Sequence, residues 1–114
     1  MDTRRSGSGD RSSPPLREVT ELGEFEGILR SHNHILVDFY AEWCGPCRLM
    51  EDTVDTVARE SDAVVVKVNV EEVPQLALEY DVHGLPAILI FQDGEVRERL
   101  VGMQEKDALL NALA

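Results

Sequence analysis

The stretch that decides the fold occupies residues 34–47 and reads HILVDFYAEWCGPC. Residues 34–41 are rich in β-branched and aromatic side chains and are long enough for a buried central strand, in which Asp38 is the one acidic residue. Beyond it, one helical face carries the apolar residues Cys47, Met50, Val54, Val57 and Ala58. A helix is therefore expected to begin at the cysteine motif and to continue to about residue 60.

The chain before this stretch predicts a tail, a strand and a helix. Residues 1–15 are rich in Gly, Ser, Pro and Arg without apolar periodicity, which indicates a flexible tail outside a domain at residues 16–114. Residues 16–19 are extended in character, and Thr20 can cap a helix. The apolar positions of that helix are Leu22, Phe25, Ile28 and Leu29.

The chain after the stretch predicts two further strands, a hairpin and two helices. Residues 63–70 suit a buried strand, and Pro74 suits the first turn of a short helix. Residues 85–91 suit another strand, and Asp93-Gly94 is a hairpin signal before an antiparallel strand at residues 95–101. A last helix over residues 104–113 would bury Leu109, Leu110 and Leu113. The sum is an α/β fold with a mixed central sheet and helices on both faces.

Length and charge exclude several classes of protein. A chain of 114 residues has room for one domain at roughly 100 to 200 residues each. With 11 basic and 22 acidic residues, its net charge of −11 repels phosphates and anionic lipids, so neither nucleic acid nor membrane is an expected partner. The longest apolar runs are far short of the ~20 residues that span a bilayer. The N-terminal residues lack the apolar segment of a secretory signal, so we expect a cytoplasmic location.

The basic residues carry one further signal, because nine are Arg and two, Lys67 and Lys106, are Lys. Together with the 22 acids, this composition is typical of proteins from a high-salt, halophilic cytoplasm. Molar salt shortens the Debye length to about 3 Å and relieves the repulsion between carboxylates. An acidic protein from a low-salt cell is the alternative, and both interpretations are open.

The chemistry is expected at Cys44 and Cys47, which are the two cysteines of the chain. Residues three apart on a helix are neighbours, so their α-carbons fall within the ~4.4 to 6.8 Å that a disulfide requires. Cys44 would lie at the positive end of the helix dipole, which stabilises a thiolate and makes it the nucleophile. Cys47, one turn inside, is expected to be more shielded and to resolve the mixed disulfide between Cys44 and a substrate.

Two other interpretations of the cysteines are open. The pair is half of a zinc site that His32, His34 and His83 could complete, but there is no second Cys-x-x-Cys and Pro46 stiffens the loop. Two inert buried cysteines are the plainer alternative, but burial does not explain the order Trp-Cys-Gly-Pro-Cys between a strand and a helix. We expect no metal and, without a Gly-x-Gly-x-x-Gly loop, no bound cofactor.

Several motifs, in this order and spacing, make the chain resemble the thioredoxin family. They are Val37-Asp38-Phe39, Trp43-Cys44-Gly45-Pro46-Cys47, His83-Gly84-Leu85-Pro86, Asp93-Gly94 and Val101-Gly102. The similarity covers about residues 16 to 114. It implies a thioredoxin fold and dithiol/disulfide exchange in which Cys44 attacks and Cys47 resolves.

The resemblance implies roles for residues around the cysteines. Trp43, Gly45 and Pro46 would form the surface against which a substrate packs. Asp38 would be the buried acid beneath the motif that helps to deprotonate the resolving thiol, and Lys67 the lysine that pairs with it. A carboxyl on an otherwise apolar strand is desolvated, which raises its pKa toward the range of a general base.

A second group of residues would complete the substrate surface. Pro86 matches the family's cis-proline, which lies against the cysteines and leaves the backbone of Leu85 free to pair with a substrate strand. Gly102 and Met103 would extend a shallow apolar patch beside Val101. Met103 could equally fill the core.

A few positions depart from the family pattern. Many thioredoxins have a helix-kinking proline five residues after the second cysteine, where this chain has Asp52, so a straighter helix is expected. Glu51 and Asp52 add negative potential near the thiols, which disfavours a thiolate, whereas Arg48 favours it. Tyr40 stands where the family often has a tryptophan.

These residues predict a protein-disulfide reductase that acts on disulfide-containing proteins. The resemblance implies that a thioredoxin reductase re-reduces it, and we expect a monomer. Oxidants and isomerases of this fold usually have a histidine just before the second cysteine, and Pro46 stands there instead, which favours a reductant. An oxidase or isomerase is one alternative. A redox-independent binding module, which acts through its surface and not through the cysteines, is another.

Overall fold

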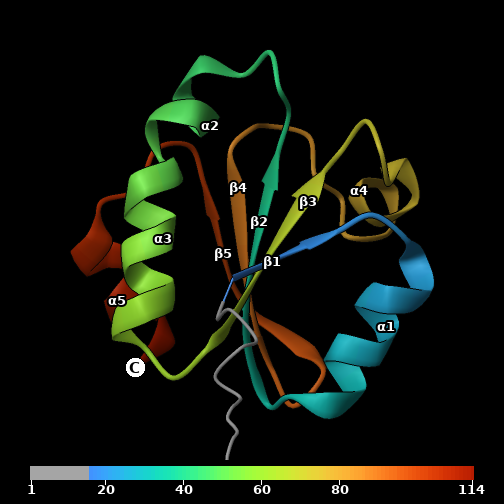
Figure 1. Ribbon diagram of the computed structural model, residues 1–114, viewed down its shortest axis with the longest axis horizontal. Helices are drawn as coiled ribbons and strands as arrows, with labels where there is room; N and C mark the ends of the chain where they lie inside the picture. Colours follow the sequence, from blue (N-terminus) through green and yellow to red (C-terminus); the bar gives the residue numbers. More distant parts are fainter. Residues whose placement is uncertain (1–15) are drawn as a thin grey trace, which may run out of the picture.

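The computed structural model describes residues 16–114, which fold into alternating strands and helices (Figure 1). In chain order the elements are β1 (Leu16–Val19), α1 (Leu22–Ser31), β2 (His34–Tyr40), α2 (Gly45–Leu49), α3 (Glu51–Glu60), β3 (Val64–Asn69), α4 (Pro74–Glu79), β4 (Ala87–Gln92), β5 (Glu95–Val101) and α5 (Lys106–Leu113). The tail expected at residues 1–15 lies outside the described part.

The strands form one mixed sheet in the order β1-β3-β2-β4-β5. β3 is parallel to β1 and β2, whereas β4 runs antiparallel to β2, and β5 runs antiparallel to β4. The β4–β5 hairpin turns at Asp93 and Gly94, whose φ angles of 53° and 87° suit a two-residue turn. The predicted mixed sheet, with β2 at its centre, is therefore confirmed.

Helices cover both faces of the sheet, with α1 and α4 on one face and α3 and α5 on the other (Figure 1). Side chains of β2 alternate between the two cores: Val37 and Phe39 pack in the core that contains Phe25 of α1, and Leu36 packs in the core that contains Val54 of α3. This alternation places Asp38 on the α3 face. No helix within residues 16–114 is long and apolar enough to cross a membrane.

The single helix expected from the cysteines to residue 60 is divided at Met50. This residue has ψ −5°, and its N–H is shared between the carbonyls of Pro46 and Cys47, each at 3.2 Å. The straighter helix expected from Asp52 is therefore not found. Glu51 and Asp52 lie in the first turn of α3, where negative charge is favourable at a helix N-terminus, so acids suit this position as a proline does.

Several element boundaries also differ from the prediction by one or two residues, those of α1 and β4 among them. The N-cap of α1 is Glu21 rather than Thr20, whose backbone N–H donates to Oε1 of Glu24 at 3.3 Å. β4 begins at Ala87 because the preceding Pro86 has no N–H to donate to the ladder. Of the three leucines expected to be buried in the last helix, Leu109 and Leu113 are buried and Leu110 is half-buried.

Candidate active site

The two cysteines lie at the start of α2, just after the end of β2. Their sulfurs form a disulfide, with the Cα atoms 5.3 Å apart. Cys44 is the N-cap residue of α2, and its Sγ accepts a hydrogen bond from the N–H of Cys47 at 3.2 Å. The first cysteine thus lies at the helix end where the backbone N–H groups and the dipole stabilise negative charge on sulfur.

The two cysteines are equally shielded in this disulfide form, since each residue is 4% exposed. The expectation that Cys47 is more shielded than Cys44 is therefore wrong for this form. Both pack in one small cluster with Ala41, against which Leu85 also packs. The hydrogen bond to Sγ, rather than burial, is what distinguishes the two sulfurs.

An exposed apolar surface surrounds the buried disulfide. Trp43 is 69% exposed, and Gly45 and Pro46 beside it are exposed as well. Nε1 of Trp43 donates a hydrogen bond to Oε2 of Glu71 at 3.1 Å. Glu71 could not be predicted as part of the site, because this contact joins residues 28 positions apart and no local pattern marks it.

The loop before β4 lies against the cysteines. The Leu85–Pro86 peptide is cis, as the resemblance implies, and Leu85 packs on the cysteine cluster. The N–H of Gly102 donates to the carbonyl of Pro86 at 2.8 Å, and its φ of 90° is a conformation that favours glycine. Met103 is 54% exposed, so it does not fill the core.

An apolar groove of about 480 Å³ opens beside Trp43, between the cysteine loop and α4. Its lining residues are Trp43, Val70, Pro74, Ala77, Leu78, Val82, His83 and Leu85. Of these lining residues, Trp43 and Leu85 are the two that were expected in the substrate surface from the sequence. Leu78 was not predicted, because the apolar pattern of α4 indicates only which side of the helix faces the core. Leu78 lies on the other side and is 79% exposed, and an exposed leucine of this kind can indicate a binding surface.

Asp38 is buried on the α3 face of the sheet, with 3% of its surface exposed. Burial raises the pKa of its carboxyl from the usual 3.8 to about 7, against the opposing effect of the Lys67 charge. A carboxyl that titrates near neutral pH can accept and return a proton under ordinary conditions. This burial agrees with the desolvated acid expected at position 38.

Lys67 lies beside Asp38 in the parallel register of β2 and β3. Within residues 16–114, its ion pair is with Glu51, at 4.0 Å from Nζ to Oε2, and Nζ also lies 4.7 Å from the centre of the Tyr40 ring. The positive charge acts on Asp38 through space. The direct pair expected between Lys67 and Asp38 is thus replaced by contacts with Glu51 and Tyr40.

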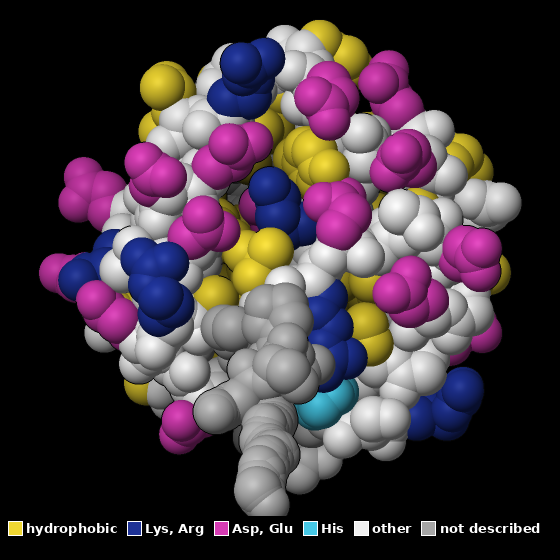
Figure 2. Space-filling model, in the orientation of Figure 1, with side chains coloured by type: hydrophobic (Ala, Val, Ile, Leu, Met, Phe, Trp, Pro, Cys, Tyr) yellow, Lys and Arg dark blue, Asp and Glu magenta, His cyan; other side chains and the backbone are white. Residues whose placement is uncertain are grey.

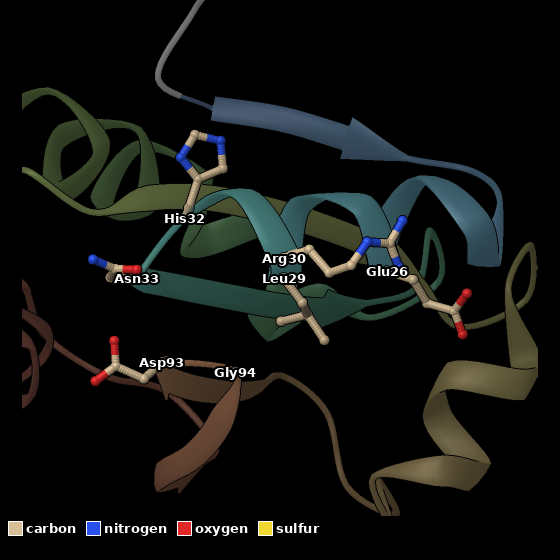
Figure 3. A pocket seen from close by; sticks show the side chains of 7 residues that line it. All are labelled: Glu26, Leu29, Arg30, His32, Asn33, Asp93 and Gly94. Atoms are coloured by element: carbon tan, nitrogen blue, oxygen red, sulfur yellow. The ribbon is translucent and has the colours of Figure 1, made fainter.

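The histidines do not gather around the cysteines. His32 and His34 lie at the start of β2, whereas the cysteines follow its end, and His83 lines the groove. No group of three or more His, Cys, Asp or Glu side chains within residues 16–114 could hold a metal ion. A separate open hollow of about 690 Å³ lies between α1 and the β4–β5 turn, away from the cysteines, and is lined by Glu26, Leu29, Arg30, His32, Asn33, Asp93 and Gly94 (Figure 3).

The fold and the site define a class of protein. A Cys-x-x-Cys pair that opens a helix after a central strand, beside a cis-proline loop and an exposed tryptophan, belongs to the thiol–disulfide exchange proteins. Comparisons with known proteins agree. The family model described as thioredoxin matches residues 17–114. The chain belongs to the thioredoxin family, whose activity is dithiol/disulfide exchange.

Individual relatives match over nearly all of their own length. Thioredoxin 1 of Synechococcus elongatus is 42% identical over 97 residues, which cover 83% of this chain and 91% of the relative. Among solved structures, a mutant thioredoxin from Halobacterium salinarum NRC-1 is 40% identical with a TM-score of 0.84, covering 89% of this chain and 90% of that one. Mitochondrial thioredoxin 3 from Saccharomyces cerevisiae, in its oxidised form, is 29% identical with a TM-score of 0.80, covering 89% and 97%.

Proposed function

We propose that the protein is a reductant of protein disulfides in which Cys44 attacks and Cys47 resolves. The observation that carries the proposal is the disulfide at the start of α2, whose first sulfur lies at the helix end beside the exposed Trp43. In the reduced form, the helix N-terminus stabilises the Cys44 thiolate. Gly45 and Pro46 leave no histidine before the second cysteine, which favours a reductant over an oxidant or isomerase.

The reaction transfers two electrons in two exchange steps. The Cys44 thiolate attacks one sulfur of a substrate disulfide, so that a bond forms between Cys44 and that sulfur while the other substrate sulfur leaves as a thiolate and takes up a proton. Cys47 then loses its proton and attacks Sγ of Cys44, which releases the second substrate sulfur. The substrate is reduced, and the protein ends in the disulfide form described above.

Asp38 is the proposed acceptor of the Cys47 proton, and Lys67 the cation that adjusts its proton affinity. The support is the burial of Asp38 and its pKa near 7, which matches a group that must exchange protons at neutral pH. Lys67 lowers this pKa and so favours the carboxylate that can act as a base.

The substrate would bind on the surface around the disulfide. Leu85 would pair through its backbone with an extended substrate segment; the support is that it lies two residues before the first residue of the β4 ladder and packs on the cysteine cluster. Trp43, Gly45 and Pro46 would contact one side of that segment, and Gly102 and Met103 the other. The exposed apolar side chains of this surface, Trp43 and Met103, suit partners of varied sequence.

Members of the thioredoxin family generally work with a thioredoxin reductase and disulfide-containing substrates. For this chain we propose the same partners, a monomeric state, and maintenance of protein thiols in the cytoplasm. Cytoplasmic thiols are kept reduced, which is the setting in which a reductant of this kind is useful.

Trapping the mixed disulfide tests the roles of the cysteines. Cys47→Ser is expected to accumulate a covalent adduct with a disulfide-bonded protein such as insulin, because the attacking thiol is intact and the resolving thiol is gone. Cys44→Ser, the matched control, is expected to form none and to reduce none. An adduct in Cys44→Ser but not in Cys47→Ser, seen on non-reducing gels and by mass spectrometry, would reverse the assignment.

A further inference from the structure

Lys67 lies in the middle of a row of charged residues on neighbouring strands. The parallel register places Glu18 of β1 beside Lys67 of β3, and Lys67 beside Asp38 of β2. All three lie on the α3 face, because the residues next to them in each strand face the other core. The space-filling view shows a basic side chain in a hollow at the middle of one face, with acidic side chains on both sides (Figure 2).

Two further groups enclose the ammonium of Lys67. Oε2 of Glu51, in the first turn of α3, lies 4.0 Å from Nζ. Nζ of Lys67 lies 4.7 Å from the centre of the Tyr40 ring. The hydroxyl of Tyr40 donates a hydrogen bond to Oε2 of Glu18 at 2.7 Å. The Lys67 side chain is 14% exposed, against 53% for Glu51. Glu51 therefore contacts the ammonium from the solvent side, while Asp38 lies below it in the sheet.

We propose that Glu51 is a positioning residue for Asp38: it pairs with the Lys67 ammonium on the α3 side and so sets how strongly that cation acts on the carboxyl beside it in the sheet. The inference rests on the proposed role of Asp38 in proton transfer from the resolving thiol. The ion pair with Lys67 gives Glu51 a route to Asp38 that other acids of α3 lack.

Two effects of Glu51 act in the same direction. Its negative charge disfavours a second carboxylate nearby, and its pairing with Lys67 weakens the positive charge that Asp38 meets. The charges that face Asp38 come from Lys67 on β3, Glu18 on β1 and Glu51 on α3, while β4 contributes the apolar Ile88 in register. Lys67 has the largest effect of the three charges, and Glu18 and Glu51 both oppose it, so removal of Glu51 favours the carboxylate of Asp38 further.

The direct test follows the titration of the Asp38 carboxyl carbon by NMR in the full-length oxidised protein, in which the disulfide keeps both cysteines from titrating. In Glu51→Gln, the midpoint is expected to fall by less than about one pH unit, because Lys67 already acts on Asp38 and the change removes only the opposing effect of Glu51. Glu51→Asp keeps the charge and is expected to restore most of the wild-type midpoint. Asp52→Asn, the matched control, removes an equal charge from the same helical turn and is expected to leave the midpoint in place.

An unchanged midpoint in Glu51→Gln would overturn the inference. An equal shift in Asp52→Asn would overturn it as well, because the shift would then come from loss of any negative charge at the start of α3 and not from the ion pair with Lys67. A second readout is the pH profile of protein-disulfide reduction, whose acidic limb should move to lower pH with the midpoint of Asp38. If the midpoint moves and the profile does not, Glu51 positions Lys67 as inferred and the proposed role of Asp38 is wrong. If neither moves, Glu51 has no such role and the reductase assignment is untouched.

Discussion

Replacing Asp38 by asparagine is expected to stabilise the protein above neutral pH and to change little in acid. The side chain is 3% exposed, so its carboxylate has lost almost all of its hydration, whereas asparagine has nearly the same shape and no charge. The polarity of a buried amide adds a term that does not depend on pH. The comparison of the two proteins across pH therefore isolates the cost of ionising Asp38.

The size of this cost follows from the pKa of Asp38, which burial raises from 3.8 to about 7. Below pH 3.8 the carboxyl is protonated in both states and folding carries no penalty. As the pH rises, the unfolded chain releases its proton first, and stability falls by about 1.4 kcal/mol per pH unit until the folded state also ionises. The total loss is roughly 4 kcal/mol, of which roughly 2.5 kcal/mol falls between about pH 5 and 8.

The assay is guanidinium chloride unfolding of the oxidised protein, followed by far-UV circular dichroism at the two pH values. Asp38→Asn should gain roughly 2.5 kcal/mol over the wild type on going from about pH 5 to 8. Asp52→Asn, at an exposed position, is the control for loss of one negative charge and should show no such gain. An equal difference between wild type and Asp38→Asn at both pH values would refute the reasoning, because Asp38 would then ionise as easily in the folded chain as in the unfolded one.

Two further predictions concern stability away from the site. Arg97 of β5 donates from Nη2 to the carbonyls of Ala112 at 2.7 Å and Ala114 at 3.0 Å and so holds the end of α5 against the sheet. Arg97→Gln should therefore lower the free energy of unfolding by about 1 kcal/mol in chemical denaturation. Arg99→Gln, on the same strand, is the control and should cost less, because its one side-chain hydrogen bond within residues 16–114 is a long 3.4 Å contact with the carbonyl of Asp81. With a net charge of −11, the protein should gain stability between about 0.1 M and molar KCl, as the Debye length falls from about 10 Å to about 3 Å, and a flat or falling free energy of unfolding would contradict an adaptation to salt.

Much of the fold could be predicted because local patterns agreed with the final packing. The run at residues 34–40 is apolar on both sides, as a strand buried on both faces must be, and Asp93-Gly94 supplied the left-handed turn of the hairpin. The break at Met50 could not be predicted, because the apolar face continues across it. A hydrophobic pattern specifies which side of a helix is buried, not whether its backbone is continuous.

The site could be predicted where it is carried by a contiguous motif and not where it depends on contacts between segments. The cysteines, Trp43 and the loop at Pro86 belong to such motifs. Glu71 and Leu78 contribute to the surface around Trp43 from separate elements, and neither belongs to a motif. The family resemblance implied Asp38 as the partner of Lys67, but α3 brings the carboxylate of Glu51 to Lys67, which no motif in the sequence reveals.

The central claim is that Cys44 and Cys47 form a redox pair poised to reduce protein disulfides. The most direct test is the reduction potential of that pair in glutathione and dithiothreitol buffers, followed by the fluorescence of Trp43, the one tryptophan of the chain. We expect a value of about −270 mV, as for thioredoxin, whereas a value above about −200 mV would place the protein among oxidants and isomerases and contradict the assignment as a reductant.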